Sequence, residues 1–371
     1  MSRVVDILRE ELREFAGYSS ARKEASGGTV WLNANESPWS AAGDTQGLNR
    51  YPEPQPAALV ARLSALYGVN SAQLLVSRGS DEAIDLLTRA ACRAGRDSVL
   101  ISAPTFGMYS VCAKVQDATV VNIPLLAEHG FALDVDAVAA AITAADNDQR
   151  IKLVYICSPN NPTGAAVALA DTERLARAAH GRALVVVDEA YAEFSDAASA
   201  TSLLTTCPNL LVLRTLSKAY AMAGARIGCV IGDPTVIAVL RSIMAPYPLP
   251  TPCVVAALAA LSDSATALVR SRIALQRCER ARLVRALSEL PQVLKVFASD
   301  ANFVLVKWVD AAATYQRALA AGVVLRVPSP QPGLQNCLRI SIGTPEENQR
   351  LLAVLAGQSR ADGQVNAEAH A

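Results

Sequence analysis

The chain has few of the residues on which zinc sites and hydrolytic triads depend, because only three histidines occur among 371 residues. They are His129, His180 and His370, and the last lies in a polar tail. A Ser-His-Asp triad needs a histidine base, and zinc sites use histidine and cysteine at close spacing. We therefore expect neither kind of site and assign no metal ligand.

The sequence also lacks closely spaced cysteines and long runs of residues with the same charge. The eight cysteines form no Cys-x-x-Cys motif, and most lie within apolar runs, which favours reduced, buried thiols over a disulfide framework. The formal net charge is zero and no long run of one sign occurs. Composition thus provides no electrostatic basis for binding nucleic acid or an anionic membrane surface.

A signal peptide is not expected, because residues 1–15 alternate charged and apolar side chains and lack an apolar core of the signal type. Residues 242–261 carry no charge and are long enough to cross a bilayer. Proline at every second position from 246 to 252, however, favours an extended connector over a helix. We expect a soluble, cytoplasmic protein without a membrane partner.

Lysine is scarce as well, with six lysines against 28 arginines. One of them, Lys218, follows an apolar run, residues 209–216, that predicts a buried strand. Lysine is the basic residue whose pKa falls readily on burial, so it can act as a neutral amine. An amine at the end of a buried strand is suited to a Schiff base with a carbonyl cofactor. The alternative is a lysine that merely extends from a strand end into water.

Short apolar runs alternate with helical patterns from about residue 73 to residue 245. This alternation predicts an α/β fold with a mostly parallel sheet covered by helices on both faces. The expected strands are Gln73–Ser77, Ser98–Ser102, Thr119–Pro124, Lys152–Cys157, Ala183–Val187, Asn209–Leu216 and Ile227–Ile231, and the expected helices include Glu82–Cys92 and Asp171–His180.

Length and the proline-rich connector predict a large domain and a smaller α+β domain. We expect the smaller domain to contain a long helical region, Cys253 to Leu290, and the strands Asn302–Val309 and Cys337–Ile342, and to be completed by the N-terminal segment. The predicted divisions are an N-terminal arm at 1–45, a large cofactor-binding domain at 46–245, a small domain at 246–356 and a disordered tail at 357–371.

Polar residues follow four of the predicted strands, and in an open α/β sheet ligands bind outside the carboxyl ends of the strands. After the first strand, the chain turns through Gly79 into a helix for which Ser80 would be the N-cap, followed by Asp81. Free amides at a helix start bind phosphate, although ordinary capping accounts for these residues equally well.

The next two loops add an amide and a carboxylate. Asn161 lies in Cys-Ser-Pro-Asn-Asn-Pro-Thr-Gly, where prolines stiffen the backbone, although a plain turn is the alternative. Asp188 ends an intensely apolar strand, where an unpaired carboxylate would be costly. A protonated pyridine nitrogen would be a suitable cationic partner. A metal-binding aspartate of the Walker-B type is disfavoured because no Walker-A loop occurs.

The fourth loop contains Ser217, Lys218 and, eight residues later, Arg226. Together the four loops provide an amine, a carboxylate, an amide donor and a phosphate cradle. Pyridoxal phosphate requires that set, because it needs a lysine Schiff base and an acidic partner for its ring nitrogen. The sequence therefore predicts a pyridoxal 5'-phosphate enzyme.

Four further segments carry a more specific resemblance. They are Leu-Asn-Ala-Asn-Glu-Ser-Pro at 32–38, Arg-Tyr-Pro-Glu-Pro-Gln-Pro at 50–56, Pro-Thr-Phe-Gly-Met-Tyr at 104–109 and Leu-Arg-Ile-Ser-Ile-Gly at 338–343. With them the chain resembles the fold-type I pyridoxal-phosphate aminotransferases and, within that class, the histidinol-phosphate aminotransferase family. The resemblance extends from about Tyr18 to Ile342.

The resemblance implies a role for each of the polar residues. Lys218 would hold the cofactor as a Schiff base and move a proton, and Asp188 would keep the ring nitrogen protonated; Tyr191 completes the catalytic set. The remaining cofactor contacts would come from Asn161 and Tyr191 at the ring hydroxyl, Phe106 on the ring face, Ser80, Asp81, Ser217 and Arg226 at the phosphate, and Tyr51 from the other subunit of a homodimer with a shared active site.

The resemblance further implies that Arg326 and Arg339 bind the substrate anion, with Asn161 and Tyr18 nearby. Two residues depart from the family pattern: Phe106 stands where many relatives have tyrosine, and Tyr18 lacks a preceding proline. The implied reaction moves an amino group between L-histidinol phosphate and 2-oxoglutarate, with imidazole acetol-phosphate as the keto partner, in histidine biosynthesis.

Two kinds of alternative remain at this point. An aromatic or broad-range aminotransferase, or an amino-acid-phosphate decarboxylase of the same fold, would have a similar cofactor site. A non-catalytic, cofactor-sensing module fused to a transcription regulator would need a DNA-binding region, and about 30 N-terminal residues are too few to supply one.

Overall fold

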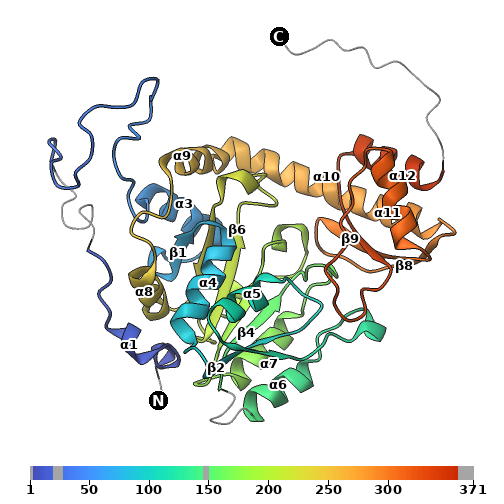
Figure 1. Cartoon of the computed structure of the whole chain (residues 1–371), viewed down its shortest axis with the longest axis horizontal. Helices are drawn as coiled ribbons and strands as arrows, with labels where there is room; N and C mark the ends of the chain where they lie inside the picture. The colour runs from blue at the N-terminus through green and yellow to red at the C-terminus, as the bar shows by residue number, and fades with distance from the viewer. Residues whose placement is uncertain (1–2, 20–27, 145–149, 358–371) are drawn as a thin grey trace.

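The computed structural model describes residues 3–19, 28–144 and 150–357, and a seven-stranded sheet lies at its centre (Figure 1). The strand order is β1-β7-β6-β5-β4-β2-β3, and β7 runs in the opposite direction to the other six strands of this sheet. The mostly parallel sheet is therefore confirmed. The strands are β1 Leu74–Ser77, β2 Asp97–Ile101, β3 Thr119–Asn122, β4 Arg150–Cys157, β5 Leu184–Asp188, β6 Leu210–Thr215 and β7 Gly228–Ile231, each close to a predicted one.

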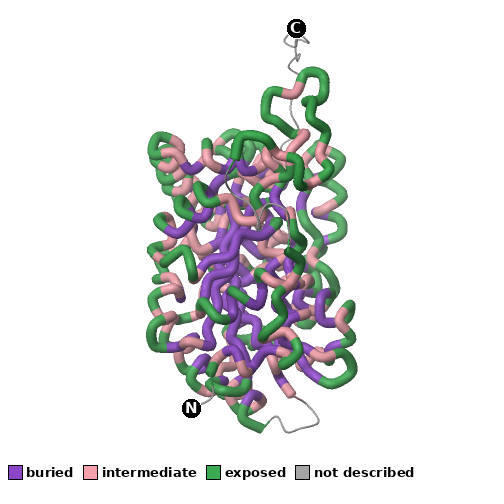
Figure 2. The backbone as a smooth tube through the Cα atoms, turned by 90° about the vertical axis from the view of Figure 1, so that its left-hand side faces the viewer, coloured by how far each residue is buried: buried purple, intermediate pink, exposed green. Residues whose placement is uncertain are grey.

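Helices cover both faces of this sheet. Successive residues of a strand point to opposite faces, so Leu153 and Val186 pack in one apolar layer and Val154 and Val185 in the other. Because both faces are covered, the strands read as continuous apolar runs, and Figure 2 shows this buried centre. The first layer includes α4 Gly79–Ala91, α5 Met108–Val115 and α8 Pro234–Ile243, and the second includes α3 Ala57–Tyr67, α6 Val135–Ala144, α7 Leu169–Ala178 and α9 Thr251–Ala260.

A second, antiparallel sheet of order β10-β9-β8 has its own apolar core (Figure 1, right). Two of its strands match predicted ones. The third, β8, was not predicted, because it is only four residues long and none of its residues is fully buried. The elements of this part are α10 Asp263–Ser288, β8 Val293–Val296, β9 Phe303–Trp308, α11 Ala311–Ala320, β10 Cys337–Ser341 and α12 Pro345–Leu355.

The single helical region expected at 253–290 is two helices, α9 and α10, bent by 70° at their break. The break has a local cause, because the Ser262 side chain accepts a hydrogen bond from the amide of Ala265 and so caps α10. Among the described residues no single helix is long and apolar enough to cross a membrane, although this bent pair meets the criterion when taken together.

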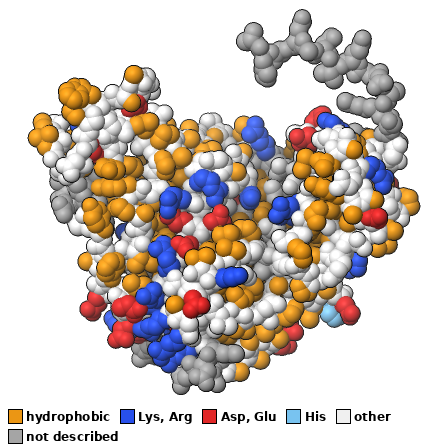
Figure 3. All heavy atoms as spheres, in the orientation of Figure 1, with side chains coloured by type: hydrophobic (Ala, Val, Ile, Leu, Met, Phe, Trp, Pro, Cys, Tyr) orange, Lys and Arg blue, Asp and Glu red, His pale blue; other side chains and the backbone are white. Residues whose placement is uncertain are grey.

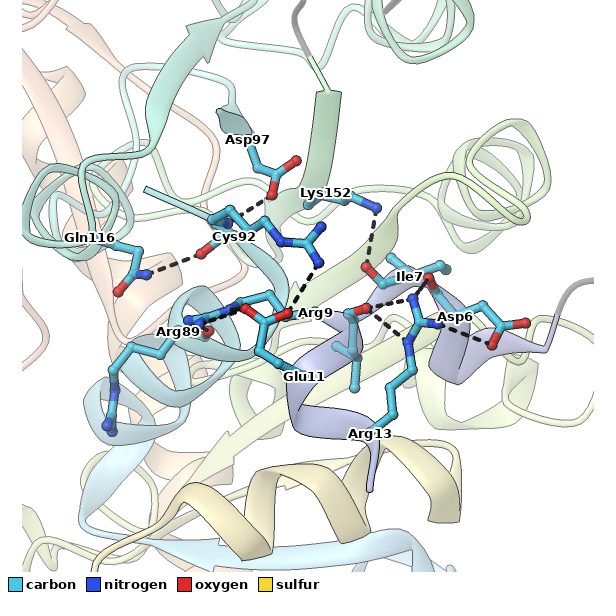
Figure 4. A network of polar contacts seen from close by, with 12 residues as sticks. Asp6, Ile7, Arg9, Glu11, Arg13, Arg89, Cys92, Asp97, Gln116 and Lys152 are labelled. Carbon is cyan, nitrogen blue, oxygen red and sulfur yellow. Dashed lines mark hydrogen bonds and ion pairs between the residues drawn. The ribbon is translucent and has the colours of Figure 1, made fainter. Parts of the chain in front are cut away.

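The N-terminal helical turns, Val4–Ile7 and α1 Glu10–Arg13, pack on the large sheet's layer beside α8, not on the small sheet as expected. Polar contacts reinforce this packing (Figure 4). Arg9 donates to the carbonyl of Arg89 at 3.1 Å, and Lys152 Nζ donates to the carbonyl of Ile7 at 3.2 Å. The domain bounds stay a prediction, and the tail beyond Gly357 lies outside the described residues.

Residues 28–56 form an arm that projects from the body (Figure 1, upper left, blue). Glu36 holds its base, because its carboxylate accepts from Arg50 Nη1 at 2.9 Å and from the amide of Tyr51 at 2.7 Å. Several apolar side chains of the arm are exposed, and Figure 3 shows them in orange at the upper left. Leu32 is 88% exposed and Trp39 79% exposed. The arm thus presents an apolar surface that the described parts of its own chain leave exposed.

Candidate active site

The carboxyl ends of β4, β5 and β6 bring three of the predicted loops to one edge of the sheet. In the parallel register, Asp188 pairs with Cys157 on one side and with Leu213 on the other. A pocket of ≈ 480 Å³ opens at this edge. The predicted residues that line it are Ser80, Asp81, Phe106, Asn161, Asp188, Tyr191, Ser217, Lys218, Arg226, Arg326 and Arg339.

Lys218 follows β6 and reaches the pocket from a tight turn, in which the amide of Ala221 donates to the Lys218 carbonyl at 3.2 Å. The residue is accessible from the pocket, yet desolvation of its ammonium lowers the pKa of Lys218. The positive charges of Arg339 and Arg226 lower this pKa further, while Asp81 and Asp188 oppose the change. The lysine is therefore biased toward the neutral amine.

Asp188 is buried at the end of β5 and lines the same pocket. Its Oδ2 accepts from the Tyr109 hydroxyl at 2.7 Å, and its Oδ1 accepts from the amide of Ala190 at 3.1 Å. Burial raises the pKa of Asp188 to about 6, and these two hydrogen bonds oppose the rise. We expected a cationic partner, but within the described residues the only side-chain partner is a neutral phenol. The carboxylate is therefore available to pair with a cationic group bound in the pocket.

The start of α4 lies beside Ser217 and Arg226 at one corner of the pocket. Arg226 donates to Asp81 Oδ2 at 3.0 Å and to Ser217 Oγ at 3.3 Å. Gly79 has a φ of +75°, and a Cβ there would lie 2.5 Å from Arg226 Nη2, so glycine permits this close approach. The helix begins at Gly79 with Arg78 as N-cap, so the N-cap prediction for Ser80 is wrong. Ser80 instead lies in the first turn, where backbone amides are free to bind an anion.

Asn161 connects two other predicted residues. Its Nδ2 donates to the Tyr191 hydroxyl at 3.3 Å, and its Oδ1 accepts from Arg339 Nη1. Tyr191 and Arg339 also contact one aromatic ring, since the Tyr191 ring meets Phe303 edge-on at 5.1 Å and the Arg339 guanidinium lies 5.2 Å from the centre of that ring. Desolvation lowers the pKa of Arg339 and raises the pKa of Tyr191.

Two predicted residues lie outside the pocket within one chain. Tyr51 is 49% exposed and stacks on Tyr247, with ring centroids 4.4 Å apart. Tyr18 is 66% exposed and lines a separate cavity of ≈ 190 Å³ together with Arg241. The prediction that Tyr18 lies beside the substrate arginines is therefore not met within this chain.

Sequence reasoning missed several residues that support the site. Tyr109 was noted only as part of a motif, although it binds Asp188 and stacks on Tyr155 with centroids 4.4 Å apart. Arg214 forms buried ion pairs with Glu189 at 2.6 Å and with Glu193 at 2.9 Å. A usable signal existed for Arg214, because a charge inside an apolar strand needs a buried partner. In the described parts of the chain, no group of three or more His, Cys, Asp or Glu side chains could hold a metal ion.

Comparisons with known proteins agree along nearly the whole chain. Residues 23–355 match the sequence model of the family described as aminotransferase class I and II. A histidinol-phosphate aminotransferase of Stenotrophomonas maltophilia (strain R551-3) is 52% identical over 360 residues, covering 96% of this chain and 98% of the relative. One of Xylella fastidiosa (strain 9a5c) is 52% identical over 354 residues, covering 95% and 96%.

Solved structures show the same fold. The histidinol-phosphate aminotransferase of Sinorhizobium meliloti, in complex with pyridoxal-5'-phosphate, superposes with a TM-score of 0.75 at 26% identity and covers 83% of each chain. An aspartate aminotransferase of Thermus thermophilus with maleate has a TM-score of 0.72 at 27% identity and covers 85% of each chain.

Proposed function

Because this chain belongs to the class I and II aminotransferase family, among the histidinol-phosphate aminotransferases, we propose that it transfers the amino group of L-histidinol phosphate to 2-oxoglutarate in histidine biosynthesis. Imidazole acetol-phosphate is the keto partner in this assignment. The observation that carries the assignment is the convergence of Lys218, Asp188 and the start of α4 on one pocket. An amine, a buried carboxylate and an anion site in that arrangement suit pyridoxal 5'-phosphate.

The pocket residues fit this cofactor. Asp188 is buried, and among the described residues no cation forms a hydrogen bond or ion pair with it, so it can pair with a protonated ring nitrogen. The amides at the start of α4, with Arg226 and Ser217, suit a dianionic phosphate. Lys218 would hold the cofactor through its amine. Asn161 and Tyr191 would hydrogen-bond the ring hydroxyl, and Phe106 would cover one ring face.

When bound, the cofactor supplies a reactive carbonyl for amines and an electron-withdrawing ring. The chain's own residues do the rest. The lowered pKa of Lys218 favours the neutral amine, whose Nζ would accept a proton from the substrate Cα and return it. Asp188, as an anion, would favour the protonated ring nitrogen. Arg339 and Arg326 bind the substrate anion, which is a phosphate in one half-reaction and a carboxylate in the other.

We further propose a homodimer that completes the site. The exposed apolar arm at 28–56 supports this proposal, because apolar surfaces of this kind mark protein contacts. Tyr51, which lies outside the pocket of its own chain, would then reach the phosphate in the other subunit. We place the enzyme in the cytoplasm, in keeping with its cysteine pattern.

Steady-state kinetics with 2-oxoglutarate as acceptor tests the assignment. L-Histidinol phosphate should be the preferred donor, because the paired arginines recognise its phosphate. Unphosphorylated histidinol and phenylalanine are the comparison donors. If histidinol reacts as well as its phosphate, the substrate assignment is wrong. If phenylalanine is preferred, the enzyme is an aromatic aminotransferase.

A further inference from the structure

A segment of the small-sheet part lines the active-site pocket. Residues 327–336, here called the strap, follow Arg326 and lead into β10. Pro328, Ser329 and Gln331 of the strap line the pocket together with Arg326. Residues 105–108, which include Phe106, form another part of the pocket wall. The strap therefore lines the same pocket as the residue expected on the cofactor ring.

One side chain joins the strap to residues 105–108. Gln331 Oε1 accepts from the amide of Thr105 at 3.0 Å, and Gln331 Nε2 donates to the carbonyl of the same residue at 3.2 Å. The side-chain amide thus binds both the N–H and the C=O of Thr105, which belong to two successive peptide units, as a residue of an adjacent antiparallel strand would. These two bonds join residues 226 positions apart in the chain.

Thr105 is a firm anchor for the strap. It is buried, and its Oγ1 donates to Asn160 Oδ1 at 2.8 Å. Asn160 is buried too, and its Nδ2 donates to the carbonyl of Pro104 at 2.9 Å and to Thr163 Oγ1 at 2.7 Å. Gln331 therefore binds to a fixed part of the large sheet's loops.

The strap has few other attachments. At its start, Arg326 and Arg339 exchange two backbone hydrogen bonds, of 3.1 Å and 2.9 Å. Near its end, Leu334 is buried in a small apolar cluster with Phe131. Within the part of the chain that the structure describes, residues 327–333 form no other hydrogen bond to elements outside the strap. The contact with Thr105 thus holds the middle of the strap.

We propose that Gln331 is a positioning residue that fastens the strap to Thr105 and keeps Arg326 in place for the substrate anion. The inference rests on the proposed function in that it assigns this anion to L-histidinol phosphate. When the strap is unfastened, only part of the molecules present the complete site. The apparent substrate affinity is then the intrinsic affinity multiplied by the fraction of molecules that present the complete site.

Replacing Gln331 by Met keeps its length and removes both hydrogen bonds. Two hydrogen bonds of ordinary strength predict a KM for L-histidinol phosphate that rises roughly 5- to 30-fold. The turnover number should change less than about threefold, because Gln331 fastens the site and does not react. Gln335→Met is the matched control, since Gln335 lies in the same strap and is exposed.

Hydrogen exchange of the holoenzyme gives a second readout that needs no substrate. The amide of Thr105 and those of the strap should exchange faster in Gln331→Met than in the wild type, while Gln335→Met leaves them unchanged. The proposal is overturned if exchange at Thr105 does not respond. It is also overturned if KM stays within twofold, or if turnover and cofactor affinity fall as much as substrate affinity. A wild type that does not use L-histidinol phosphate would refute the proposed function, whereas the exchange comparison would still test the fastening.

Discussion

Arg339 on β10 donates a hydrogen bond to Asn161 in the loop after β4, and this contact joins the small sheet to the large one inside the pocket. It also orients the Asn161 amide, because the oxygen faces Arg339 and the nitrogen faces Tyr191. An anion bound by Arg339 would compete for the same guanidinium. Substrate binding and the orientation of a cofactor contact are thereby coupled through one amide.

Lys218 should be the residue that carries the cofactor, because its pKa is lowered and it lines the pocket. Borohydride reduction of the holoenzyme followed by peptide mapping should place a pyridoxyl group on Lys218. Lys152 is an internal control, since desolvation lowers its pKa as well, but it lies near the N-terminal turns. Modification of Lys152 instead of Lys218 would contradict the assignment.

Asp188→Asn should retain the cofactor and lose transamination activity by about 10²- to 10⁴-fold, because a neutral amide cannot hold the proton on the ring nitrogen. Single-turnover rates of each half-reaction measure this loss. The absorbance spectrum of the bound cofactor controls for binding. Half-reaction rates near those of the wild type would show that Asp188 only supports the structure.

The same substitution should change how the cofactor-free protein responds to pH. Burial raises the pKa of Asp188 from 3.8 to about 6, so the native state binds this proton more tightly than the unfolded state. The contribution of Asp188 to stability is therefore largest at low pH and falls as pH rises from about 4 to about 6.

Asp188→Asn removes this pH-dependent contribution. The free energy of unfolding of the variant, relative to that of the wild type, should therefore rise between about pH 4 and about pH 6. The rise should be no more than about 3 kcal/mol. Urea unfolding of both cofactor-free proteins at pH 4 and pH 7 measures it. A difference that does not depend on pH would mean that Asp188 has an ordinary pKa.

Arg339→Ala should impair both half-reactions, because the phosphate of one substrate and the carboxylate of the other use the same site. Loss of a charge-assisted contact predicts a decrease in kcat/KM of roughly 10- to 100-fold for each substrate. The substitution should also raise the pKa of Lys218, since the charge of Arg339 lowers it in the wild type. The pH dependence of chemical acylation of Lys218 in the cofactor-free protein reports this shift. An effect on one substrate alone would contradict a shared site.

Tyr51 should act across the dimer, because it is exposed and does not line the pocket of its own chain. Mixed dimers of Tyr51→Ala and Lys218→Ala subunits test this. If Tyr51 acts in trans, one site of the hybrid carries both lesions and the other is intact, so activity should partly return. If it acts in cis, each site keeps one lesion and no activity returns. Tyr51→Ala alone must first be shown to lower activity.

The sequence alone was sufficient for the large sheet and for which polar residues lie at its edge. Buried strands such as β5 and β6 are continuous apolar runs, and their ends are marked by the polar residues Asp188 and Lys218. Both signals are local in the chain, and parallel strands place their carboxyl ends at one edge. The sequence alone therefore places Asp188 and Lys218 in one crevice.

The tertiary structure decided which side chains meet. Tyr109 and Asp188 are 79 positions apart, and Gln331 and Thr105 are 226 apart, so neither pair has a local pattern. The packing of α5 on the large sheet and of the strap on residues 105–108 creates these contacts. Tyr18 lies in another cavity beside Arg241, against the motif-based expectation. Hydrogen-bond partners depend on how distant segments pack, whereas strands and strand ends depend on neighbouring residues.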